Sequence, residues 1–396
     1  MSPRVARRDL FGYTSAAGIA AAAGIVSGRL TKAGATAQEA AAVSRQSYSA
    51  YGEHQSGITT PAPAAGKIVA FDLLDGVDQA ALGRFMRVWT SSIVALMEGH
   101  PTPGDAAPDL AHEAVSMSVA VGFGPAVFEI PGLAGSRPSG FMDIPPMDHD
   151  ELAERWCGGD IVAFVSADDD TSIDYAVRRL TVDAKPFATP RWVQSGSWRG
   201  VDAQGNAVTG RNLFGQVDGT GNPSGDTLAE ALWSTDGWFT GGTQMVIRRI
   251  EMDLDVWDTL IRDKQEKSVG RRLDTGAPLT GEAETDAMDL SATHDGELVI
   301  PADAHARVSH PSQNSGRTML RRGLNYTHTD NAGATTSGLL FVSFQASLAD
   351  QFIPVQTKLD HSDALNEWTT AIGSAVFAIL PGFDADGHLG DGVLGG

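Results

Sequence analysis

The sequence predicts an α+β fold made of two halves, each an antiparallel sheet with helices packed against it. Two observations predict this fold. Segments with an apolar period of two alternate along the 396-residue chain with segments whose apolar residues recur every three or four positions. A polar stretch rich in Gly and Asn, residues 200–210, separates two such series. No sequence repeat relates the halves, so the division depends on the order of elements.

The first half gives the sharper pattern. Strands are expected at residues 67–73, 115–121, 160–166 and 191–197. The first helix begins after Asp78, a suitable N-cap, and its apolar stripe comprises Leu82, Phe85, Met86, Trp89, Ile93, Leu96 and Met97. The second helix covers residues 171–180, with Ile173, Ala176, Val177 and Leu180 on one side. This order, β-α-β-β-α-β, is the ferredoxin-like arrangement.

The second half repeats this order more loosely. Strands are predicted at residues 244–252 and 339–346, and helices at residues 254–261 and 363–377. A long excursion rich in Asp and Gly lies between them. The expected domains are therefore residues 38–209 and 210–396, which follow a leader at residues 1–37.

That leader predicts a twin-arginine export signal. Arg7 and Arg8 precede a weakly apolar stretch at residues 12–25, and the small residues 35–37 offer a cleavage site. The apolar stretch is too short to be a good membrane span. This signal leads us to expect that the chain is secreted or lies in the cell envelope or periplasm. The twin-arginine route carries proteins that are already folded. From the leader to about residue 58, an arm is expected that becomes ordered only where it meets the body.

Charge and cysteine content restrict the partners. The formal net charge is -20, and the leader holds five basic residues against one acid, so the mature chain is near -24. Such a surface repels nucleic acid and anionic membranes, and no stable membrane insertion is expected. Cys157 is the only cysteine, which excludes an internal disulfide. Walker-type loops, paired His-x-x-His clusters and Gly-x-Ser-x-Gly elbows are absent from the sequence.

Three distant segments carry chemistry. They are Gly-Gln-Val-Asp-Gly at 215–219, continued by Thr-Gly-Asn-Pro, then Asp-Ala-His-Ala-Arg at 303–307, and Arg-Arg-Gly at 321–323. Together they resemble the dye-decolourising peroxidase family. Further matching segments are residues 52–61, 121–125, 157–160 and 340–345. The resemblance implies two ferredoxin-like domains, with one noncovalent haem b per chain held between sheet and helices, since the single cysteine rules out a Cys-x-x-Cys-His attachment.

The same resemblance implies a role for each site residue. His305 is the axial ligand of the haem iron, and its carboxylate partner is Asp363, Asp360 or Glu367, which the sequence does not distinguish. Asp218 is the acid/base for peroxide and Arg321 the fixed cation, with Arg322 as runner-up. Residues expected at the haem edge or wall are Gly219, Thr220, Gly221, His310, Pro311, Ser312 and Phe344, the last equally explained as core.

The predicted function is reduction of hydrogen peroxide coupled to oxidation of a small aromatic donor, such as a phenol or dye. One alternative within the resemblance is a deferrochelatase that handles haem in iron acquisition. Another is a haem-binding protein without catalysis, against which the presence of both Asp218 and Arg321 argues. The oligomeric state is left open, with a homo-oligomer compatible with the sequence.

Overall fold

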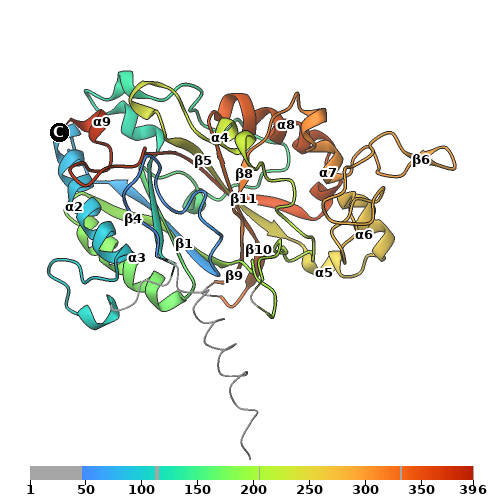
Figure 1. Cartoon of the computed structure of the whole chain (residues 1–396), viewed down its shortest axis with the longest axis horizontal. Coiled ribbons are helices and arrows are strands. Elements are labelled where there is room, and N and C mark those ends of the chain that lie inside the picture. The colour runs from blue at the N-terminus through green and yellow to red at the C-terminus, as the bar shows by residue number, and fades with distance from the viewer. Residues whose placement is uncertain (1–46, 112–115, 205, 331, 396) are drawn as a thin grey trace, which may run out of the picture.

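The computed structural model describes residues 47–111, 116–204, 206–330 and 332–395 (Figure 1). The predicted export leader, residues 1–37, lies outside the described residues, as does Val115 at the start of one predicted strand. Within the described part, no helix combines the length and apolar character that crossing a membrane requires.

The first half follows the predicted order of elements. Its elements are β1 (Ala65–Leu73), α2 (Gln79–Met97), β2 (Ser118–Phe123), β3 (Ile161–Ala167), α3 (Asp170–Ala184) and β4 (Ala188–Ser197). The strands pair antiparallel in the order β2-β3-β1-β4. This is the ferredoxin-like arrangement, and the sequence prediction is confirmed.

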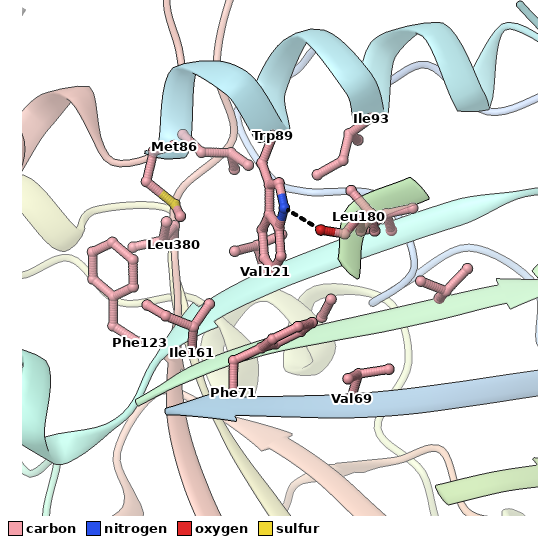
Figure 2. Packing of buried hydrophobic residues seen from close by; sticks show 14 of the residues in the cluster. Val69, Phe71, Met86, Trp89, Ile93, Val121, Phe123, Ile161, Leu180 and Leu380 are labelled. Atoms are coloured by element: carbon pink, nitrogen blue, oxygen red, sulfur yellow. Dashed lines mark hydrogen bonds between the residues drawn. The ribbon is translucent and has the colours of Figure 1, made fainter. Parts of the chain in front are cut away.

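Helix α2 shows how the sequence specifies this half. Asp78 accepts a hydrogen bond from the backbone N–H of Ala81 at 2.8 Å and so caps the first turn. Every residue of the predicted apolar stripe is buried. Figure 2 shows Trp89 pointing from α2 toward the sheet, and its Nε1 donates to the carbonyl of Leu180 in α3 at 3.0 Å. Truncating such a buried aromatic to Ala costs about 3–5 kcal/mol.

The second half contains the remaining elements. These are α4 (Asp226–Leu232), β5 (Thr243–Met252), α5 (Leu254–Trp257), α6 (Arg262–Val269), β6 (Thr293–His294), β7 (Glu297–Leu298), α7 (His305–Val308), β8 (Leu320–Arg321), β9 (Leu324–Thr329), β10 (Thr335–Gln345), α8 (Ile353–Ser362), β11 (Thr369–Ile379) and α9 (Asp391–Leu394). The larger strands pair antiparallel in the order β11-β5-β10-β9, which is again ferredoxin-like.

The two sheets join into one closed sheet. Strand β11 pairs with β2 at one seam, and β4 pairs with β9 at the other. Because β5 pairs with both β11 and β10, the strands form a ring. Figure 1 places α2 and α3 at one end of the molecule and α6, α7 and α8 at the other.

The predicted helix at residues 363–377 is wrong. Residues Ala364–Glu367 form a 3₁₀ turn, and the remainder is strand β11. Its register against β5 shifts between Ala371 and Gly373, which leaves Ile372 as an extra residue. The bulge interrupts the period of two, so the apolar spacing imitates a helix. The β-branched Thr369 and Thr370 favour the strand, and the central Gly373 disfavours a helix.

The predicted helix at residues 254–261 is also corrected, because α5 ends at Trp257 and α6 begins at Arg262. The Trp257 ring stacks on Phe214 with centroids 4.2 Å apart, and this packing fixes the end of α5. The side chain of Gln265 in α6 donates to the carbonyl of Trp257 at 2.9 Å and satisfies that helix end. Tertiary packing therefore divides a segment that periodicity joins.

The ring has an inner and an outer apolar face. One core cluster fills the inside with side chains from both halves, including Ile68, Phe164, Ile247 and Phe344. A second cluster lies between the outer face of the first half and helices α2 and α3. The outer face of the second half, by contrast, borders a cavity.

Candidate active site

The cavity lies between the outer face of the second sheet and its helices. Its walls come from β5, β10, β11, α7 and α8 and from the loop at residues 212–221. Apolar wall residues are Phe214, Ile250, Met252, Met288, Met319, Leu339, Phe341, Phe352, Val355 and Leu359. The space between the walls, its open mouth included, is about 1800 Å³. Apolar walls of this kind suit a large organic cofactor.

The loop that carries Asp218 is a tight hairpin. The backbone N–H of Asp218 donates to the carbonyl of Gly210 at 2.9 Å, and that of Asn212 donates to Gln216 at 3.1 Å. Gly219 adopts a φ of 127°, which an L side chain would strain, so the chain turns sharply after Asp218. Asn212 also donates from Nδ2 to Asp218 Oδ2 at 3.4 Å. The turn and this contact hold the carboxylate at the cavity wall.

Arg321 reaches the same wall from strand β8. Its Nε lies 4.0 Å from Oδ1 of Asp218, and both side chains remain partly exposed. Since successive residues of a strand point to opposite faces, Arg322 turns away. The Arg322 guanidinium donates to the carbonyls of Ile58 and Thr60, and burial lowers its pKa to about 10. Arg322 therefore binds the segment at residues 58–60 and does not line the cavity.

His305 opens helix α7 and faces the cavity with a side chain that is 38% exposed. Its Nδ1 lies 2.5 Å from Oδ2 of Asp363, whose side chain is 6% exposed. Burial acts to lower the pKa of His305, but the Asp363 carboxylate outweighs it and raises that pKa overall. The bond to Asp363 leaves Nε2 as the nitrogen available to a metal.

Of the three proposed carboxylate partners, the structure selects Asp363. Asp360 instead accepts hydrogen bonds from the backbone N–H groups of Asp148 and His149 at 2.7 and 3.0 Å. Glu367 lies 3.5 Å from the Lys264 ammonium in an exposed pair.

Most of the residues named from the sequence meet at this cavity. Those that line it are Asp218, Gly219, Thr220, Gly221, His305, His310, Pro311 and Arg321. Ser312 is not among the lining residues; its Oγ and backbone N–H contact Nδ1 of His310 at 2.9 and 3.2 Å. Ser312 thus supports His310 without reaching the cavity.

Phe344 is also displaced from its expected place. It is fully buried inside the closed ring, with the inner core cluster. Alternation along β10 puts Leu339 and Phe341 on the cavity face instead. The sequence left Phe344 open between cavity wall and core, and the structure places it in the core, since closure of the ring decides which face is interior.

Sequence reasoning also missed Arg271 and Arg317, two of the arginines that line the cavity. Burial lowers the pKa of Arg271, whose Nη1 donates to the carbonyls of Gly276 and Glu284 at 2.7 and 2.9 Å. Arg317 donates from Nε to the carbonyl of Asp350 at 2.6 Å. Neither arginine is in a motif that the sequence marks, so only the fold reveals them.

The site therefore combines the His305 imidazole backed by Asp363, the Asp218–Arg321 pair, and apolar walls. An imidazole polarised by a carboxylate, with apolar walls around it, fits what haem iron needs from a protein. Residues 55–198 match the description "Dyp-type peroxidase, N-terminal", and residues 209–384 match "Dyp-type peroxidase, C-terminal".

The chain belongs to the Dyp-type peroxidase family.

Similar proteins agree with this assignment. The dye-decolorizing peroxidase of Thermobifida fusca (strain YX) is 37% identical over 365 residues, covering 86% of this chain and 84% of that protein. The deferrochelatase of Shigella flexneri is 32% identical over 375 residues, covering 87% of each. The crystal structure of the DyP-type peroxidase from Cellulomonas bogoriensis has a TM-score of 0.85 and 44% identity, covering 89% of this chain and 99% of that one.

Members of the Dyp-type peroxidase family whose structures are solved include haem complexes. This Dyp-type peroxidase is accordingly a haem enzyme that uses hydrogen peroxide and an electron donor.

Proposed function

We propose that this peroxidase oxidises phenolic or dye-like donors outside the cytoplasm, with His305, Asp218 and Arg321 in the three principal roles. The observation that carries these roles is the convergence of the three residues on one cavity from three separate segments of the sequence. When bound, haem supplies the redox-active iron at which peroxide is reduced.

His305 would hold the haem through Nε2. Asp363 fixes the orientation of the His305 ring and makes Nε2 a stronger metal ligand, because its carboxylate accepts a hydrogen bond from the Nδ1–H group. Arg271 and Arg317 would supply positive charge for the carboxylates of haem b, and the apolar walls would exclude water from its faces. Nothing in this arrangement needs a covalent attachment.

Asp218 accepts a proton from peroxide and returns it to the departing oxygen, as a positioned carboxylate can. Arg321, at 4.0 Å, keeps its positive charge throughout and stabilises negative charge that develops beside it. The two groups divide proton transfer and charge stabilisation between them.

The sequence of residues 1–37 supports export by the twin-arginine route, to the periplasm, envelope or medium. Lysine substitution of Arg7 and Arg8 together is expected to leave the folded enzyme in the cytoplasm, and cell fractionation would detect this. Appearance of the substituted protein outside at the normal level would contradict the export proposal.

A second candidate function is handling of haem for iron acquisition, which the 32% identity to a deferrochelatase favours. That function predicts release of porphyrin from the haem-loaded chain, measurable as porphyrin fluorescence. A peroxidase role predicts rapid turnover of peroxide and donor without such release. A haem-binding protein without catalysis would show neither.

Stopped-flow absorption tests the main proposal. The haem-loaded chain, mixed with stoichiometric hydrogen peroxide, should show a rapid Soret shift that a phenolic donor reverses. Asp218→Asn should slow the shift by about 10²–10⁴-fold and Arg321→Leu by about 10²–10³-fold, with haem retained. If only Arg321→Leu slows it, the role of Asp218 is wrong.

The axial-ligand assignment has its own test. His305→Ala should empty or severely loosen the haem site in a hemin titration. His361→Ala, a change at an exposed histidine of α8, is the matched control and should bind haem normally. A normal five-coordinate ferric spectrum in His305→Ala would refute the assignment.

A further inference from the structure

The side chain of Asn222 forms hydrogen bonds with both backbone polar groups of Arg321. Its Nδ2 donates to the carbonyl of Arg321 at 2.9 Å, and its Oδ1 accepts from the N–H of Arg321 at 3.0 Å. One amide thus reproduces the pair of bonds that a neighbouring β-strand residue would make. The two residues are 99 positions apart in sequence.

This pairing matters because strand β8 is short. Only Leu320 and Arg321 belong to it, and they pair with β10 at Phe344 and Ser343. The other edge of Arg321 is where Asn222 binds. A two-residue edge strand has little of its own to hold it, so the Asn222 amide supplies a large part of the constraint on the Arg321 backbone.

Asn222 is also tied to Asp218. Its backbone N–H donates to the carbonyl of Gly219 at 2.9 Å, which closes the turn that immediately follows Asp218. Within this turn, a Cβ added to Gly221 would lie 3.7 Å from Nη2 of Arg321, so the turn backbone runs close beside the guanidinium. The same short segment therefore contacts both members of the Asp218–Arg321 pair.

We infer that Asn222 is a positioning residue that sets the separation of Asp218 and Arg321. It does not line the cavity and acts through the Arg321 backbone. The inference rests on the proposed roles of Asp218 and Arg321 and adds the residue that keeps them at 4.0 Å.

The first experiment measures the rate of the Soret change with hydrogen peroxide in haem-loaded, full-length Asn222→Ala. A displacement of about 1 Å in a catalytic group can cost about 10²-fold, and we expect a loss of about 10- to 100-fold. The ferric spectrum should be unchanged, and the haem affinity should stay within about twofold of that of the unsubstituted enzyme. The reason is that His305 and Asp363 are bonded to each other independently of this turn.

Asn206→Ala is the control. The Asn206 side chain also donates from Nδ2, to Oδ2 of Asp202 at 2.9 Å, but it has no bond to Arg321 and does not line the cavity. Its peroxide rate should stay within about twofold of the unsubstituted enzyme. An equal loss in both variants would mean that Asn222 has only a general structural role and would overturn the inference.

A second variant keeps the test valid if Asn222→Ala folds poorly. Asn222→Asp has nearly the same shape and can still accept from the N–H of Arg321, but it places an oxygen against the Arg321 carbonyl. We expect an intermediate loss of rate. A rate equal to that of the unsubstituted enzyme would contradict the need for both bonds.

A double-mutant cycle separates the inference from the proposed function. Asn222→Ala added to Arg321→Leu should slow the enzyme by less than about twofold beyond Arg321→Leu alone, because the group being positioned is gone. Additive losses would overturn the inference. If Arg321→Leu itself leaves the rate unchanged, the proposed role of Arg321 fails instead.

Discussion

Asp363 uses its two carboxylate oxygens for different partners. Oδ2 lies 2.5 Å from Nδ1 of His305, while Oδ1 accepts from the N–H of Leu365 at 2.9 Å and caps the 3₁₀ turn that follows. This cap holds the carboxylate in an orientation that points Oδ2 at the imidazole. Because Asp363 follows α8 and His305 begins α7, the pair also joins these two helices.

The pairing of Asp363 with His305 predicts the effect of Asp363→Asn. The amide keeps the shape and an oxygen for the cap but removes the negative charge that polarises His305. Haem affinity should fall by about 10- to 100-fold, and the ferric/ferrous reduction potential should rise because the ferric state loses support. Hemin titration and spectroelectrochemistry would measure both. An unchanged potential would show that the carboxylate does not act on the axial ligand.

The side chain of Glu284 anchors the hairpin that carries Asp218. One oxygen, Oε1, accepts from the hydroxyls of Thr209 and Thr220 at 2.6 and 2.8 Å. These threonines flank the hairpin, so a single carboxylate ties both of its ends to the excursion between α6 and α7. Asp218 thereby depends on a segment that lies outside its motif.

Removal of this anchor should disturb proton transfer more than haem binding. Glu284→Ala loses both bonds, and we expect the peroxide rate to fall by about tenfold, whereas Glu284→Gln keeps an acceptor oxygen and most of the rate. Stopped-flow rates and hemin titrations on the two variants check this. Equal rates in Glu284→Ala and the unsubstituted enzyme would rule out a positioning role.

Another element-scale link joins Asp360 of α8 to the segment that contains Asp148 and His149. Burial alone would raise the pKa of Asp360, but the N–H groups of Asp148 and His149 and the His149 ring lower it overall. When folding depresses the pKa of a carboxyl, that carboxyl stabilises the protein at pH values above its unfolded-state pKa of about 3.9. The contribution disappears as the pH falls through the folded-state pKa.

This linkage gives a prediction of pH dependence. At pH 7 the Asp360→Asn variant should unfold with about 2 kcal/mol less free energy than the unsubstituted protein in the same cofactor state. The difference should shrink as the pH falls below about 4. Denaturant titrations at several pH values measure it. A difference that stays constant down to the acid limit would mean that Asp360 contributes through shape alone.

The molecule as a whole depends on two narrow seams between its sheets. At the β2–β11 seam, Gln55 is buried and donates to the carbonyls of Val121 and Leu380, each at 2.8 Å. Its Oε1 accepts from the N–H of Val121 at 2.9 Å. One side chain therefore joins the first half to the end of the second, where few backbone pairs do so.

Gln55→Leu should lower the free energy of unfolding by about 2–4 kcal/mol, since it leaves backbone groups at the seam without partners. Guanidinium denaturation measures the change, with the exposed Gln204→Leu as control. Loss of cooperativity, seen as separate transitions of the two halves, would also follow from a weakened seam. An unfolding curve equal to that of the control would show that the seam does not need Gln55.

The sequence alone determined the elements with local signals. The N-cap at Asp78 and the apolar stripe of α2 are local, since both depend on spacing within one helix. The motifs also place Asp218, His305 and Arg321 correctly at the cavity, because each brings its own turn or strand geometry. The strand at β11 was missed because its bulge conceals the period that such reasoning uses.

Only the tertiary structure decided which side of each strand faces the cavity and which carboxylate meets His305. Closure of the ring puts Phe344 inside and Phe341 at the cavity, a choice of phase that β10 cannot make by itself. Asp360, Asp363 and Glu367 are close in sequence, yet the end of α8 and the turn after it direct only Asp363 to the imidazole. These contacts join segments far apart in the chain, and their geometry exists only once both sheets have closed.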